Sequence, residues 1–93
     1  DLRSLADALR VEVAQAYNGF ASAHVALDAA RAGLAAAEES YRVRREQFRA
    51  GAAIAVDVID SEAQLRQARL DLVNTLIDLR VAKARLDRAL EAD

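Results

Sequence analysis

The chain has 93 residues, enough for one domain, with no proline, three glycines and 4% aromatic residues. Its excess of alanine and leucine favours helices and disfavours β-sandwiches and loop-rich folds. The charges nearly balance, with 13 basic and 15 acidic residues. A nucleic-acid partner is therefore not expected, because the basic surface that attracts phosphates is missing.

The absence of cysteine leaves the redox compartment open. No run of 18 uncharged apolar residues could cross a bilayer, so we expect no membrane contact by this chain. It begins at Asp1, without methionine or a leader, and we expect it to be a piece of a longer protein.

Large residues recur every seven positions through the first half of the chain. They are Val13, Phe20, Leu27, Leu34, Tyr41 and Phe48, and a line of Ala16, Ala23, Ala30 and Ala37 follows three residues behind. This spacing predicts a helix over about residues 2–49 with a coiled-coil seam. Gly19 and Gly33 lie inside it, and we expect them to mark close approach of a second helix.

The repeat stops at Phe48, and Gly51 follows where a left-handed C-cap commonly ends a helix. We predict a tip loop over about residues 50–56 and a second helix over about residues 57–90, capped by Asp57 or, alternatively, by a residue just before it. The second helix repeats Val58, Leu65, Leu72, Leu79 and Leu86, beside Ser61, Ala68, Thr75, Ala82 and Ala89.

Two such helices joined by one short turn predict an all-α fold, an antiparallel two-helix coiled-coil hairpin. With the turn centred near Ala53, the line of large residues in the first helix would face the line of large residues in the second, pair by pair. The predicted seam consists of Phe20, Leu27, Leu34, Tyr41, Phe48, Val58, Leu65, Leu72, Leu79 and Leu86. In this register Phe48 would lie near Val58, Tyr41 near Leu65 and Phe20 near Leu86.

A further apolar line runs along the second helix, about 140° from the seam on a helical projection. Its members are Ala63, Leu70, Ile77 and Ala84. A helix with two apolar edges has two neighbours, which predicts one stave of a larger α-helical barrel. The alternative is that alanine is simply abundant and these flanks are solvated.

No catalytic, metal or cofactor site can be assembled from the sequence, so an enzyme is not predicted. The single histidine, His24, falls near the seam without cysteines or clustered carboxylates. Arginines at 42, 44, 45 and 49 could form an anion or partner site. Glu38 and Glu46 lie four residues from Arg42, however, which favours a solvated face of interleaved charges.

The run Phe48-Arg49-Ala50-Gly51 followed by Ala52-Ala53-Ile54-Ala55-Val56 and Asp57-Val58-Ile59-Asp60 resembles a motif of the TolC-like outer membrane efflux proteins. That motif is Tyr/Phe-x-x-Gly, five residues, then Asp-Val-Leu-Asp-Ala. The flanking helices are also similar to the family's periplasmic helices, so the resemblance covers nearly the whole chain. Ala52 and Ala53 depart from it, since many members have leucine at the first of these places and some carry a charged or polar residue at the second.

The resemblance implies a homotrimer whose hairpins form a periplasmic tunnel beneath an outer membrane barrel in a Gram-negative bacterium. It implies efflux or type I secretion, and a tip that docks to a periplasmic adaptor (membrane fusion) protein. The docking residues would be Arg49, Gly51, Ala52, Ala53, Ile54, Ala55, Val56 and Asp57. Alternatively, Ile54 and Val56 fold back and close the end of the seam.

Two other functions remain open at this stage. One is the coiled-coil hairpin of a periplasmic adaptor protein, and the other is a cytosolic coiled-coil scaffold. The motif from Gly51 to Asp60 fits the tunnel better than either.

Overall fold

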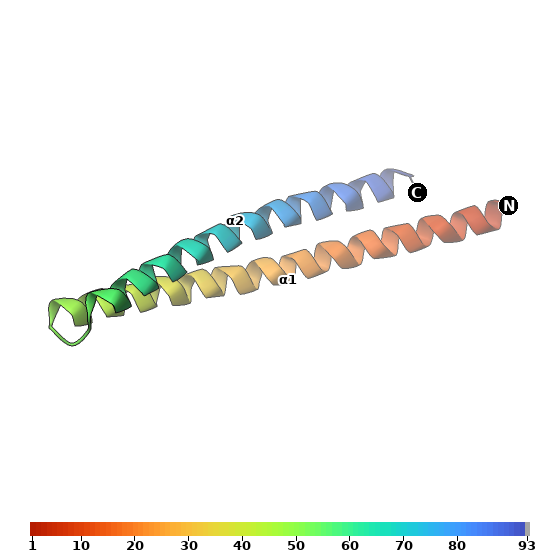
Figure 1. Ribbon diagram of the computed structural model, residues 1–93. Coiled ribbons are helices and arrows are strands. Elements are labelled where there is room, and N and C mark those ends of the chain that lie inside the picture. Colours follow the sequence, from red (N-terminus) through yellow and green to blue (C-terminus); the bar gives the residue numbers. More distant parts are fainter. Residues whose placement is uncertain (93) are drawn as a thin grey trace. The chain divides into compact units, whose positions relative to one another are not determined.

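The computed structural model describes residues 1–92, without the side chain of Ala92. Helix α1 spans Leu2–Arg49 and helix α2 spans Ala55–Ala92. They are joined by one short loop (Figure 1). The described chain contains no strand, so the predicted all-α fold with two helices is confirmed.

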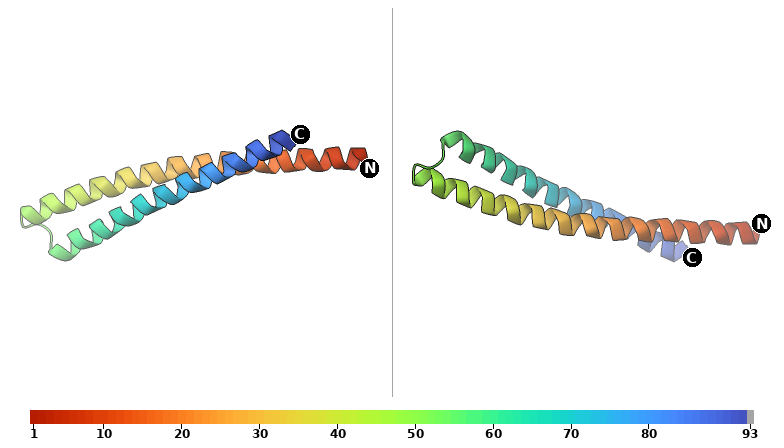
Figure 2. Two further views of the ribbon diagram at one scale, coloured as in Figure 1. Left: turned by 90° about the horizontal axis from the view of Figure 1, so that it is seen from above. Right: turned by 90° about the horizontal axis from the view of Figure 1, so that it is seen from below.

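The chain divides into two compact units. Unit 1 contains Asp1–Leu27 and the part of α2 from Thr75 onward, and unit 2 is Asp28–Asn74, which includes the loop. Within unit 2 the end of α1 and the start of α2 lie side by side and run antiparallel, as the three views in Figures 1 and 2 show. Within unit 1 the two helix segments are antiparallel as well.

Helix α1 begins with a side-chain cap. The backbone N–H of Ser4 donates to Oδ1 of Asp1 at 2.8 Å. This bond satisfies one of the four N–H groups that the first turn of a helix leaves without a backbone partner.

Helix α1 ends in a Schellman motif. Gly51 has φ = 78°, its N–H donates to the carbonyl of Phe48 at 3.1 Å, and the N–H of Ala52 donates to the carbonyl of Gln47 at 2.7 Å. Both bonds satisfy carbonyls of the last turn. The left-handed C-cap predicted at Gly51 is confirmed, and glycine suits the position because a Cβ disfavours this backbone conformation.

Helix α2 begins two residues earlier than expected. Its first residue is Ala55, and the N–H of Asp57 already donates to the carbonyl of Ile54 at 3.1 Å. Asp57 is therefore inside the first turn and is not the N-cap residue predicted from the sequence. Its carboxylate still lies where the helix dipole favours negative charge.

The most buried side chains come from the lines of large residues of both helices and from the line of small residues of α2. In unit 1, Leu27 is 2% exposed and Ala89 is 3% exposed; in unit 2, Ser61 is 4% and Leu65 is 5% exposed. Seven other seam residues are half-buried: Phe20, Leu34, Tyr41, Val58, Leu72, Leu79 and Leu86. Val13, one repeat before the seam, is half-buried too. Buried Ser61 keeps its hydroxyl satisfied by donating to the carbonyl of Val58 at 2.9 Å.

Phe48 differs from the other residues expected in the seam, because 48% of it is exposed. It lies in the last turn of α1, and α2 begins only at Ala55, after the loop. The loop supplies small side chains, chiefly alanine, that cover little of an aromatic ring.

The helices also pair about one helical turn away from the expected register. In unit 2, Ser40 and Arg44 line one groove with Asp57, Ser61 and other residues of α2. In unit 1, Glu12 lines a groove with Arg88 and Ala89, and Gly19 lines another with Val81 and Ala82. In both units, residues of α1 thus face residues of α2 that lie closer to the loop than the predicted register would place them. The shift brings large residues of one helix towards the small line of the other, which accounts for the burial of Ser61 and Ala89.

The expectation that Gly19 and Gly33 mark close helix approach is wrong within this chain. Both are exposed, and a Cβ built on either would meet nothing within 4 Å. Gly19 lines a groove with Val81 and Ala82 of α2, and the space at its Cβ position is left open and not filled by the partner helix.

Candidate functional site

The loop between the helices and the first turn of α2 expose apolar side chains. Ile54 is 66% exposed and Val56 is 57% exposed, while Ala53 and Asp57 are half-buried. Arg49, Gly51, Ala52 and Ala55 are also exposed. Ile54 and Val56 therefore do not fold back to close the end of the seam.

Two further apolar residues near the loop are exposed. Phe48 is 48% exposed and Ile59 is 60% exposed. Ile59 was not among the predicted tip residues, because it lies in α2 beyond the loop and belongs to neither seven-residue line. We call Phe48, Ile54, Val56 and Ile59 together the turn residues. Large side chains concentrated near one loop are typical of a contact surface.

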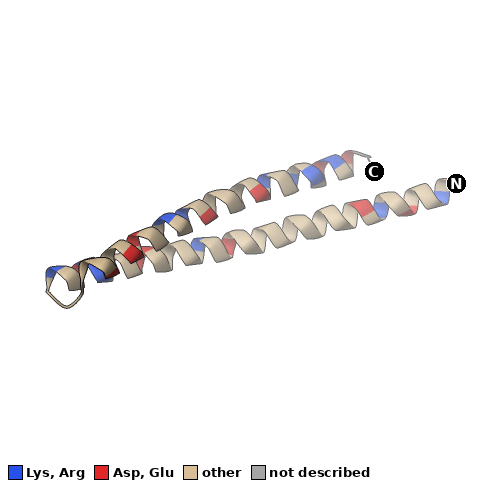
Figure 3. Cartoon of the chain, in the orientation of Figure 1, with Lys and Arg blue, Asp and Glu red and all other residues tan. Residues whose placement is uncertain are grey.

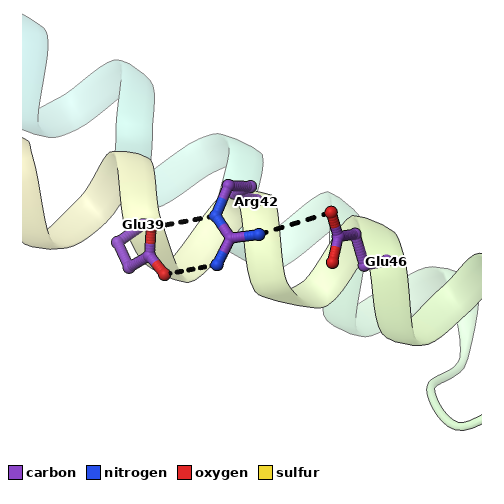
Figure 4. A network of polar contacts seen from close by, with 3 residues as sticks. All are labelled: Glu39, Arg42 and Glu46. Carbon is purple, nitrogen blue, oxygen red and sulfur yellow. Dashed lines mark hydrogen bonds and ion pairs between the residues drawn. The ribbon is translucent and has the colours of Figure 1, made fainter.

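Arg42 forms a charged network with two carboxylates on the outer surface of α1 (Figure 4). Its guanidinium donates from Nη2 to Glu39 Oε1 at 2.6 Å and from Nε to Glu39 Oε2 at 3.0 Å, and Nη1 lies 3.3 Å from Glu46 Oε1. The hydrogen bond from Arg42 lowers the pKa of the Glu39 carboxyl. In turn, the bond to Glu39 and the charges of Glu39 and Glu46 raise the pKa of Arg42.

The other arginines of this segment make different contacts. The guanidinium of Arg45 lies 5.5 Å from the centre of the Tyr41 ring, a cation–π distance. Arg44 Nη1 donates to Gln47 Oε1 at 3.3 Å. Neither Arg45 nor Arg49 forms an ion pair with any described residue. The predicted face of interleaved charges is thus present around Arg42 and does not extend to the last turn of α1.

A groove of about 200 Å³ is lined by Tyr41, Arg42, Arg45, Glu46 and Arg49. Three guanidinium groups and one carboxylate therefore border the same hollow. The groove lined by Arg44, Asp57 and Asp60 is of similar size, about 190 Å³, and carries one cation and two anions. The two grooves of unit 2 differ in the sign of their charge.

The described residues include no group of three or more histidine, cysteine, aspartate or glutamate side chains that could hold a metal ion. His24 is exposed, and its ring packs edge-on against Phe20 with 5.4 Å between the ring centres. Neither described helix has a stretch long and apolar enough to cross a membrane.

Comparison with protein families identifies the chain. The family model described as outer membrane efflux protein matches residues 1–92. The chain belongs to the outer membrane efflux protein family. Members of this family are channel and transport proteins, so the chain is a component of an outer membrane efflux channel. No curated protein and no solved structure matches it.

Proposed function

We propose that this member of the outer membrane efflux protein family forms a periplasmic tunnel hairpin of a trimeric channel for efflux or type I secretion. The loop between α1 and α2 would dock to a periplasmic adaptor protein. The observation that carries the proposal is the exposure of the turn residues, in a chain whose family is that of efflux channels.

The tunnel part of the proposal rests on apolar surface that this chain does not cover itself. Leu70 is 52% exposed and Ile77 is 53% exposed, and both belong to the second apolar line of α2, with Ala63 and Ala84. A repeated line of this kind is unfavourable in water and calls for a neighbouring helix. Lateral packing of hairpins into a barrel would cover it.

Helix α1 offers a similar surface. Residues 13–27 contain no aspartate, glutamate, lysine or arginine, which appears as a long uncharged stretch of α1 in Figure 3. Within this stretch Val25 is 70% exposed, and Ala14 and Ala21 on the same side of the helix are exposed as well. An uncharged surface with small residues allows another helix to pack closely. The two outward faces support a hairpin with neighbours on both helices.

The docking part rests on the loop. A free hairpin would be expected to place polar residues in an exposed turn, yet the loop presents Ile54 and the first turn of α2 presents Val56 to solvent. Burial of apolar area against a partner stabilises a complex by roughly 25 cal/mol per Å². The Schellman motif also fixes the backbone at Gly51 and Ala52, which reduces the conformational freedom that the loop loses when it binds.

The test uses the full-length protein. Replacement of Ile54 by Asp should abolish export and adaptor capture while the protein remains trimeric and inserted in the outer membrane. Ile54→Val is the matched control, because it retains an apolar side chain, and it should support normal export. Normal export by Ile54→Asp, or loss of the trimer together with export, would contradict docking by the loop.

A further inference from the structure

Arg45 and Arg49 lie near the loop without a carboxylate partner among the described residues. They are four residues apart in α1, so their side chains project from the same face of the helix. The nearby carboxylates of Glu39 and Glu46 both bind Arg42. The last two turns of α1 therefore present three guanidinium groups that no ion pair of the described chain neutralises; Arg44 donates to Gln47, whereas Arg45 and Arg49 share one face.

The local contacts leave these groups available for a ligand. The guanidinium of Arg45 lies over Tyr41, which restricts its rotamers and leaves its hydrogen-bond donors unused. Arg45 and Arg49 both line the groove of about 200 Å³ beside Arg42. A guanidinium has a planar fork of N–H donors that matches the two oxygens of a carboxylate.

Apolar residues next to the arginines indicate that the ligand is a protein surface. Phe48 lies between Arg45 and Arg49 in sequence and is 48% exposed, and Ile54 in the loop is 66% exposed. Protein interfaces commonly combine an apolar centre with a polar rim, and they are enriched in aromatic residues and arginine.

Resting on the proposed function, we infer that Arg45 and Arg49 bind carboxylate side chains of an acidic helical segment on the adaptor, while the turn residues pack against its apolar surface. The two arginines are separated by about one helical turn. Two aspartate or glutamate residues four positions apart on an approaching helix have the same separation, which allows both pairs to form at once.

The experiment measures binding of the full-length trimer to the purified adaptor of the same organism, at about 50 mM and about 500 mM salt, which screens exposed charges strongly. The double variant Arg45→Gln/Arg49→Gln should bind about tenfold more weakly at low salt, chiefly through slower association, and the difference should shrink at high salt. The matched control is Arg31→Gln/Arg69→Gln. It removes the same charge from exposed arginines of unit 2 that form no ion pair.

Three results would overturn the inference. The double variant could bind with the affinity and salt dependence of the natural protein, or the control could weaken binding equally. The double variant could also lose binding to vesicles containing phosphatidylglycerol while binding the adaptor normally, which would assign the arginines to lipid headgroups.

Ile54→Asp separates the two proposals: if it loses adaptor binding while the arginine variant does not, docking by the loop stands and the acidic contact is wrong. If Ile54→Asp binds normally, the proposed function itself fails.

Discussion

Replacing glycine by alanine should change the stability of this hairpin in opposite directions at Gly51 and Gly33. At Gly51 the backbone has φ = 78°, and a Cβ there would meet no atom within 4 Å. The cost is therefore purely conformational, and we expect a destabilisation of about 1–2 kcal/mol. Gly33 lies inside α1 and has the same open space around it. Alanine there should stabilise the fold by about 1 kcal/mol, because alanine is the better helix former.

Urea denaturation followed by circular dichroism at 222 nm would measure both changes, at one protein concentration chosen so that the association state is the same for all variants. Gly19→Ala serves as a second internal control, since Gly19 is also helical and open. In thermal melts a change of 1 kcal/mol corresponds to a shift in Tm of about 4–8 °C for a domain of this size. Equal stability of Gly51→Ala and the natural protein, or destabilisation by Gly33→Ala, would refute this explanation of how the turn is held.

Leu65→Ala should destabilise the fold by about 2–4 kcal/mol and Leu70→Ala by less than about 1 kcal/mol, because Leu65 is 5% exposed and Leu70 is 52% exposed. Equal losses of stability in urea melts would contradict the burial of Leu65 in the seam. Ser61→Leu should cost about 1–3 kcal/mol in the same assay through overpacking, and a stabilising effect would show that Ser61 does not face a filled seam. By ¹³C NMR titration, the pKa of Glu39 should rise in Arg42→Gln, because the hydrogen bond from Arg42 lowers it. Since the folded pKa is the lower one, this small stabilisation exists above the unfolded pKa and disappears as the pH falls through the folded value. An unchanged pKa in the variant would contradict that cause.

Local interactions made much of this protein predictable from its sequence. Helical hydrogen bonds join residues only four positions apart, so an uninterrupted seven-residue pattern was enough to predict both helices. The end of α1 was predictable for a similar reason, since the conformation of Gly51 and its capping bonds involve neighbouring residues only. The family was also recognisable before the fold was known, because the motif from Phe48 to Asp60 is continuous in sequence.

Properties that depend on two segments distant in sequence were decided by the tertiary structure. Two seven-residue lines stay in step whichever pair is matched first, so the sequence could not distinguish registers one helical turn apart. The path of residues 50–54 and the start of α2 at Ala55 decide which levels of the helices meet. They also leave Phe48 exposed and bury Ser61. The pairing of Arg42 with both Glu39 and Glu46 is local to α1, but it also required the structure, because the sequence does not decide which of several neighbouring arginines binds a given carboxylate.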